Sequence, residues 1–230
     1  MIRLADDLRV EKSQSISFSA DMYKSWDEWQ GNLLVEGFYT DLSDVFALTE
    51  IGIENGVLIK ERRNESGARV FGGTLEGKLA YKNIWQLQAG LTLQKSRYKE
   101  AHAWAEDVEA VRDMFRTPDV YGYFVTSYNP LKQFMLSLSG TYTGSMLVEH
   151  HAGYIEANRT ERTAGFMDLN FKAAYDFSLY HHIKLQLNAG VQNILNAYQR
   201  DFDQGPDRDS GYIYGPATPR CFYLGVKLSY

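Results

Sequence analysis

The chain has one cysteine and no long apolar run, and each shortage excludes a class of protein. Its one cysteine, Cys221, rules out an intramolecular disulfide and a cluster of thiolate zinc ligands. The formal net charge of −5 argues against a nucleic-acid partner, because phosphate backbones attract basic surfaces. No stretch approaches the roughly 18 consecutive apolar residues of a transmembrane helix. A transmembrane β-barrel stays possible, since alternating strands have an unremarkable mean hydropathy, here −0.37.

The last residues of the chain contain the clearest pattern. Every second side chain is apolar or aromatic: Phe222, Leu224, Val226, Leu228 and Tyr230. The residues between them are mixed and mostly polar or small. A period of two predicts a β-strand with one apolar and one polar face. The aromatic end of so regular a strand indicates that the apolar face meets lipid.

The same alternation recurs along the chain and predicts about nine long antiparallel strands. Soluble strands average about five or six residues, whereas these have about ten or more. In the second strand two alternations compete, and we favour Leu33, Val35 and Tyr39 facing outward, because this keeps Glu36 inside. The predicted strands are 13–23, 29–50, 57–81, 85–94, 117–128, 134–143, 167–177, 183–192 and 222–230.

The predicted connections alternate in length. The long connections are 99–116, 148–164 and 196–217, and the one at 51–56 is intermediate. Val108 and Val111, followed by Met114 and Phe115, are spaced as in a helix, so 99–116 is predicted to contain a short helical piece. Outer-membrane barrels have short periplasmic turns and long extracellular loops. The short connections are 24–28, 82–84, 129–132 and 178–182.

Aromatic residues gather near the predicted strand ends, as in the interfacial girdle of a membrane barrel. We therefore predict an all-β fold, an antiparallel transmembrane β-barrel segment. The alternative is a soluble all-β domain, a surface binding module or adhesin, whose apolar faces pack against each other. The girdle candidates are Tyr81, Trp85, Tyr121, Tyr123, Phe134, Tyr175, Phe177 and Tyr230.

No catalytic or metal-binding constellation is evident in the sequence. Nothing matches a G-x-S-x-G elbow, and an outer-membrane enzyme barrel would need a Ser–His pair that we do not find. His150 and His151 follow Glu149, but adjacent strand residues point in opposite directions, which disfavours a shared metal. The acidic run from Asp201 to Asp209 lacks the spacing and closing glutamate of a calcium loop. We predict a protein that is not an enzyme and holds no metal or cofactor.

Aromatic side chains in the predicted external loops are the candidate ligand contacts: Trp104, Tyr154, Tyr212 and Tyr214. Exposed aromatic rings stack on sugars or chelate rings. The alternative, that these rings pack the loops together, is equally compatible with the sequence. Polar residues of the opposite strand face either contact an inserted domain or are simply hydrated; they include Gln86, Gln88, Gln94, Lys172, Lys184 and Asn188.

Four stretches resemble the TonB-dependent outer-membrane receptor family, and together they span nearly the whole chain. Leu8 to Ser13 is similar to the family's loop-to-strand passage "L-x-P/V-E-x-S". The segment from Asn64 to Gly77 is similar to the strand "N-x-G-x-A-x-x-x-G-x-E", although Leu75 stretches its glycine–glutamate spacing. Asn188 to Tyr198 resembles "G-V-x-N-L-F-N-x-x-Y". Pro219 to Val226 resembles "P-R-x-F-x-x-G-V", which leads into the terminal strand.

The resemblance implies a barrel of about 22 strands, plugged by an N-terminal domain, in the outer membrane of a Gram-negative cell. Such receptors take up siderophores, cobalamin or glycans, using energy delivered by the TonB complex through the N-terminal part. Residues 1–230 then correspond to the C-terminal portion of the barrel, without plug or N-terminal strands. Met1 to Asp7 lacks the features of a signal peptide, which also suggests a fragment.

Nine strands do not close as a bacterial single-chain barrel, so we expect this portion alone to be unable to transport. The expected partners are membrane lipid, the rest of the receptor and the barrel-assembly machinery. That machinery would read the terminal strand, through Phe222, Leu224, Val226, Leu228 and Tyr230.

Overall fold

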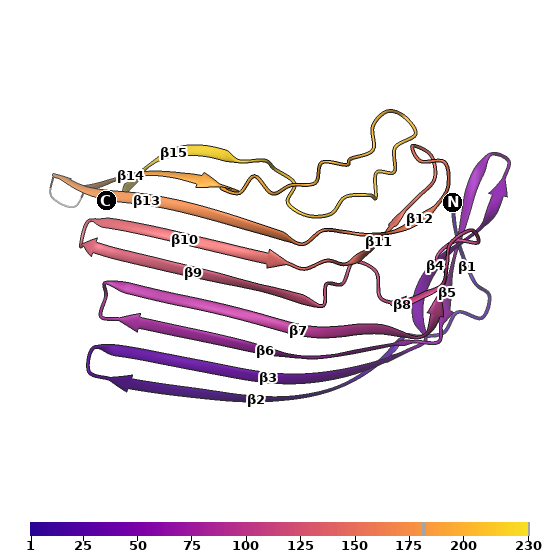
Figure 1. Ribbon diagram of the computed structural model, residues 1–230, viewed down its shortest axis with the longest axis horizontal. Coiled ribbons are helices and arrows are strands. Elements are labelled where there is room, and N and C mark those ends of the chain that lie inside the picture. The colour runs from indigo at the N-terminus through magenta and orange to yellow at the C-terminus, as the bar shows by residue number, and fades with distance from the viewer. Residues whose placement is uncertain (181–182, 230) are drawn as a thin grey trace.

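The computed structural model describes residues 1–180 and 183–229, and a single antiparallel sheet dominates it (Figure 1). Nine strands follow one another across this sheet in the order β2-β3-β6-β7-β9-β10-β13-β14-β15. The prediction of nine long antiparallel strands is confirmed. Their bounds are β2 Lys12–Trp26, β3 Trp29–Ser43, β6 Ala68–Tyr81, β7 Trp85–His102, β9 Val120–Leu131, β10 Phe134–Thr143, β13 Phe166–Tyr180, β14 Ile183–Gln192 and β15 Cys221–Ser229.

The strand register collects the alternating apolar side chains on one face. Leu75 of β6 lies opposite Val35 of β3 and Leu91 of β7, so three strands present aliphatic side chains side by side. This face remains exposed: the exposed fraction is 51% for Leu75 and 79% for Leu224. In a sandwich the same residues would form the buried core between two sheets. The outward orientation of Leu33, Val35 and Tyr39 is likewise confirmed.

The opposite face is polar and has its own hydrogen bonds. Gln88 of β7 donates to Glu76 of β6 at 3.0 Å and to the hydroxyl of Tyr123 on β9 at 2.8 Å. Tyr121 and Tyr123 therefore lie on the polar face, and their assignment to the lipid-facing girdle was wrong. The register explains the error, because Tyr123 pairs with Gly90 and Tyr121 with Thr92. Strand β9 thus places aromatic side chains on both faces.

Two predicted strands are each divided by a backbone break. The strand predicted over 29–50 ends at Ser43, and the one predicted over 57–81 begins in a loop hairpin and restarts at Ala68. Asp44 and Gly67 mark the breaks, with φ of 56° and 118°. The residues between them form β4 (Val45–Glu54) and β5 (Val57–Glu65), which pair with each other. A short strand β1 (Ile2–Leu4) pairs with β5 and completes a separate three-stranded sheet.

This division corrects the connection lengths. The turn at 51–56 is the tip of the β4–β5 hairpin, and the connection between the sheet strands β3 and β6 is the long segment 44–67. All long connections then lie at one end of the sheet (Figure 1). At the other end, hairpin turns join β2 to β3, β6 to β7 and β9 to β10. Strand β13 extends to Tyr180, so the turn predicted over 178–182 begins later than expected, and its residues His181 and His182 lie outside the described residues.

The prediction of a helical piece in 99–116 was wrong. Strand β7 continues to His102, and a short strand β8 (Val111–Asp113) pairs with it. The residues spaced as in a helix, Val108, Val111, Met114 and Phe115, are each half-buried, whereas Trp104 and Ala105 are 3% exposed. The connection 144–165 also contains a hairpin, β11 (Leu147–His150) with β12 (Arg159–Arg162). Among the described residues, none belongs to a helix able to span a membrane.

Aromatic rings line the turn end of the sheet. The ring of Trp29 lies 4.8 Å from that of Tyr81 and 6.1 Å from that of Trp85. Farther along the same rim, Phe134 lies 6.2 Å from Tyr175. Amphipathic aromatic side chains favour the boundary between lipid and water. This rim therefore has the composition expected of a membrane interface. The predicted girdle residue Tyr230 lies outside the described residues.

Candidate functional site

The long connections fold together into one cluster beyond the strand ends, and His150 lies near its centre. His150 Nε2 is 3.0 Å from Asp203 Oδ1, and the two side chains are only 5% and 2% exposed. Because a carboxylate accepts and does not donate, this contact requires a proton on Nε2. The Tyr212 ring stacks on the imidazole, with centroids 3.6 Å apart and planes 6° apart. This contact joins the connection 144–165 to the connection 193–220.

Two tyrosines share one carboxylate beside this pair. Tyr212 donates to Asp201 Oδ2 at 3.0 Å, and Tyr214 donates to both Asp201 oxygens at 2.7 Å. Burial raises the pKa of Asp201, but the hydrogen bonds from Tyr214 and Tyr212 outweigh it and the pKa is lowered overall. Burial is the main cause that raises the pKa of Tyr212 to about 12. The three groups therefore stay as two phenols and one carboxylate over a wide pH range.

His151 connects the cluster to the first long connection. Its Nδ1 lies 3.1 Å from Glu50 of β4, and its Nε2 lies 3.4 Å from Lys60 Nζ of β5. Trp104 packs edge-on against the imidazole at 4.7 Å and donates through Nε1 to Thr160 at 3.0 Å. His150 and His151 thus turn to different partners. Within residues 1–180 and 183–229, no three histidine, cysteine or acidic side chains are arranged to hold a metal.

Arg116 completes the cluster from the connection 103–119. Its guanidinium donates to the backbone oxygens of Gly211 at 2.6 Å and Ile213 at 3.1 Å. The same group lies 3.4 Å from Glu149 Oε2. All four long connections are therefore tied together by polar side chains.

A cavity of about 360 Å³ opens beside His150 and Tyr212. Its wall contains two arginines, three carboxylates and the exposed ring of Tyr154, and one of the arginines, Arg159, lies 3.2 Å from Glu161. Aromatic rings beside paired charges suit stacking and hydrogen bonding with a ring-shaped ligand such as a sugar or a chelate. Besides His150, the lining residues are Tyr154, Ile155, Arg159, Glu161, Arg200, Asp201, Phe202, Asp203, Gln204 and Tyr212.

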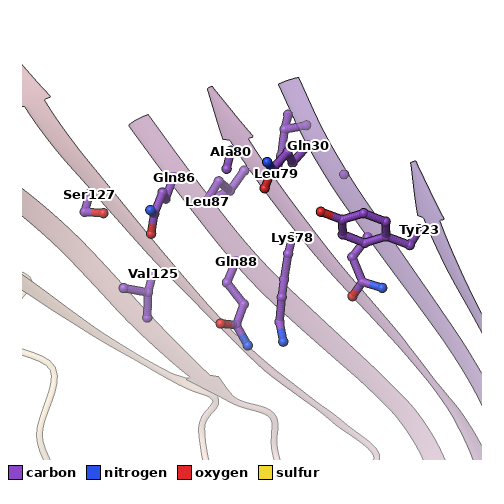
Figure 2. A pocket seen from close by; sticks show the side chains of 12 residues that line it. Tyr23, Gln30, Lys78, Leu79, Ala80, Gln86, Leu87, Gln88, Val125 and Ser127 are labelled. Atoms are coloured by element: carbon purple, nitrogen blue, oxygen red, sulfur yellow. The ribbon is translucent and has the colours of Figure 1, made fainter. Parts of the chain in front are cut away.

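A second hollow lies on the polar face of the sheet, toward the turn end (Figure 2). Tyr23 of β2, Lys78 of β6 and Gln88 of β7 line it, together with Ser127 of β9. Its volume is about 510 Å³, and it is wide open. Its uncharged amides, single lysine and hydroxyls offer hydrogen bonds to a neighbouring polypeptide or to water, without a concentrated charge.

A family model described as "TonB dependent receptor-like, beta-barrel" matches residues 3–194. The chain belongs to the TonB-dependent receptor β-barrel family. The resemblance inferred from its motifs is thereby confirmed, and so is its place among the outer-membrane proteins of Gram-negative bacteria. No curated protein sequence matches significantly.

Solved structures of receptors and transporters share the fold. The ferric-catecholate import receptor Fiu from Escherichia coli K12 superposes with a TM-score of 0.64 at 20% identity, covering 96% of this chain and 28% of that protein. The copper transporter OprC gives 0.62 at 17% identity, covering 96% and 32%. The FrpB iron transporter from Neisseria meningitidis gives 0.59 at 16%, covering 98% and 32%. The chain thus spans about three tenths of these proteins' lengths.

The family motifs of this receptor barrel have clear structural roles. Asn64 donates to the backbone oxygens of Arg9 and Asp44 and accepts from the Arg9 amide, so it joins the first two motifs. A Cβ on Gly67 would lie 2.2 Å from the Leu42 oxygen, so only glycine fits there. Asn193 bonds both backbone groups of Ala197 and the oxygen of Thr218, which shapes the start of the last loop.

The four predicted ligand-contact aromatics fall in different surroundings. Tyr154 is 55% exposed and lines the cavity, whereas Tyr212 lines it with only 5% of its surface exposed. Tyr214 is held on Asp201, and Trp104 is 3% exposed and packs on His151. Packing between loops therefore describes Trp104 and Tyr212. A ligand role for the four aromatics stays a prediction.

Sequence reasoning did not find the residues that organise the loop cluster. Asp203 was noted only as part of an acidic run, and its partner His150 is 53 residues away. Arg159 and Arg200 of the cavity were not noticed. The alternating pattern identifies strands, but it carries no signal for pairs that meet only after several loops fold together. The terminal-strand residues Phe222, Leu224, Val226 and Leu228 are 66–79% exposed on the outward face of β15, and Tyr230 lies outside the described residues.

Proposed function

We propose that the nine strands form the C-terminal part of a larger receptor barrel of about 22 strands. The outer edges of β2 and β15 have no strand partner within the described part of the chain. In lipid an open sheet edge leaves backbone groups without hydrogen bonds, at a cost of several kcal/mol each. The related structures are about three times as long as this chain, which supports additional strands that cover both edges.

We infer that the complete receptor takes up a scarce ligand of the siderophore, cobalamin or glycan class. The cavity beside His150 supports this proposal, because the exposed Tyr154 lies among arginines and carboxylates, and an aromatic ring with polar neighbours suits a chelate or a sugar. The printed titles of related structures name ferric-catecholate, ferric enterobactin and copper. A metal chelate is therefore the first ligand class to test.

The polar face of the sheet is proposed to contact a plug domain. Lys78, Gln86 and Gln88 supply hydrogen-bonding groups around the hollow near the turn end. The TonB complex would act through the N-terminal part, and the barrel-assembly machinery would read β15. The proposal is a binding and transport function without catalysis.

The exposed apolar face of the sheet carries the proposal, and fractionation tests it. We expect the protein in the outer-membrane fraction and in solution only with detergent. A monodisperse protein that unfolds cooperatively without detergent would favour the soluble alternative instead.

Ligand binding is tested separately by tryptophan fluorescence of the detergent-solubilised protein. A ferric catecholate, cobalamin and an oligosaccharide serve as the three probes. The substitution Tyr154→Ala should weaken the responding ligand about tenfold, which corresponds to about 1.4 kcal/mol. Tyr142→Ala is the matched control, because Tyr142 is an outward-facing strand residue with 41% exposure. No response to any probe would refute the cavity beside His150 as the binding site without affecting the barrel.

A further inference from the structure

The outward face of β7 changes character along its length. Leu91 and Leu93 occupy successive outward positions, and the next three positions on the same face are Lys95, Arg97 and Lys99. The register confirms the shared face, because Leu91 pairs with Leu75 and Arg97 with Arg69 of β6. The apolar band thus ends, and a row of cationic side chains begins, on the side of the sheet that faces lipid. This end of β7 adjoins the long connections (Figure 1).

These cations outnumber the carboxylates around them. We define the basic strip as Arg69, Lys95, Arg97, Lys99 and Arg162. Arg69 Nε lies 3.2 Å and Lys99 Nζ 2.5 Å from the same carboxylate, that of Asp41. Arg97 and Arg162 lie 3.2 and 3.5 Å from Asp113, and Lys95 pairs with Asp119. Five cationic groups therefore share three carboxylates.

The two central arginines keep hydrogen-bond donors free. Arg69 and Arg97 each approach their aspartate through Nε, and their Nη groups contact no acceptor in the described part of the chain. Their side chains are 58% and 54% exposed. A guanidinium presents paired donors that match the spacing of phosphate oxygens. The strip is thus open to an anionic group from the lipid side.

We propose that the basic strip binds the phosphate groups of a phosphorylated glycolipid in the outer leaflet. The strip lies where the lipid-facing apolar band ends on the loop side, which is the height of the headgroups. Long cationic side chains at this height extend to the interface and attract anionic lipids. A lipid-anchored phosphate is favoured over free phosphate, because the adjoining leucines of β7 hold the acyl chains beside the strip.

The test is native mass spectrometry of the protein in mild detergent, titrated with lipid A as a diphosphorylated glycolipid. The double variant R69Q/R97Q should bind lipid A about tenfold more weakly than the unmodified protein. The control K78Q should bind normally, because Lys78 lies on the polar face of the same strand as Arg69. Dephosphorylated lipid A should bind about tenfold more weakly to the unmodified protein.

Three results would overturn the proposal: equal binding of R69Q/R97Q and the unmodified protein, equal binding of both lipids, or displacement of lipid A by an equal concentration of inorganic phosphate. Should the double variant misfold, the comparison of the two lipids on the unmodified protein decides alone. Failure of the barrel proposal would be seen separately, as a protein that stays soluble without detergent.

Discussion

The sheet and the loop cluster follow opposite rules. In the sheet, apolar side chains such as Leu75 and Leu224 are exposed, and hydrogen bonds join neighbouring strands in a regular ladder. In the loop cluster, polar side chains are buried: His150 and Asp203 are 5% and 2% exposed. The apolar face of the sheet is stabilised by the surrounding lipid, whereas the loop cluster is stabilised by specific side-chain pairs within it.

This contrast separates two kinds of information in the chain. The sheet needs only a period of two and tolerates exchange among apolar residues on its outward face. The cluster depends on single side chains brought together from four connections, including Arg116, His150 and Asp201. In the sheet, the effect of a substitution should therefore depend on which face the side chain occupies. In the loops, it should depend on which side-chain contact is lost.

The largest effect is expected from a charge on the outward face. Leu138→Arg places a guanidinium toward lipid in the middle of β10 and should destabilise the folded protein by about 2–4 kcal/mol. Ser139→Arg is the matched control, because Ser139 is next to Leu138 in the strand but lies on the polar face, where it pairs with Val125. Urea unfolding in lipid vesicles measures both. Equal losses for the two variants would remove the distinction between the faces.

The next effect concerns the junction between the two regions. Gly67→Ala places a Cβ 2.2 Å from the Leu42 oxygen at a φ of 118°, and backbone strain of this kind costs about 1–3 kcal/mol. Gly77→Ala is the control, since a Cβ there meets nothing within 4 Å. Thermal unfolding in detergent should show a lower midpoint for the first variant only. An unchanged midpoint would show that the junction can relax.

A third substitution tests the buried pair of the cluster. Asp203→Ala leaves His150 Nε2 and the Asp209 amide without their acceptor, which should cost about 1–3 kcal/mol of local stability. Asp207→Ala, at an exposed position of the same loop, should be silent. Hydrogen exchange of the loop amides is the measurement. The loops should open in the first variant while the strand amides keep their protection.

The smallest effect is a titration. Tyr212 has a pKa raised to about 12, so its contribution to stability is complete below the unfolded pKa of about 10 and is lost as the pH rises through 12. The difference between ultraviolet titrations of the unmodified protein and Tyr212→Phe isolates this group. The substitution Asp201→Asn should lower the pKa of Tyr212, because the negative charge of the Asp201 carboxylate no longer opposes formation of the phenolate. Ionisation of Tyr212 near pH 10 would contradict the structure.

The contrast between the sheet and the loop cluster also explains which features could be predicted from the sequence. Alternation predicted the nine strands and the orientation of Val35 and Leu75, because burial or exposure of a whole face repeats every second residue. It missed the breaks at Asp44 and Gly67, since β4 and β5 are themselves strands and the sequence does not mark where they leave the main sheet. It also missed the pairing of His150 with Asp203, because that contact depends on loop geometry rather than on any local pattern.

The outward position of alternate residues is tested most directly by scanning β10 with cysteine. In a Cys221→Ser background, each residue of 134–143 is replaced in turn and labelled in membranes with a lipid-soluble and a water-soluble reagent. The structure predicts that Leu136, Leu138 and Tyr142 positions react with the lipid-soluble reagent, and that Ser137 and Ser139 positions react with the water-soluble one. The same reagent preference at neighbouring positions would contradict a barrel wall with lipid on one side and water on the other.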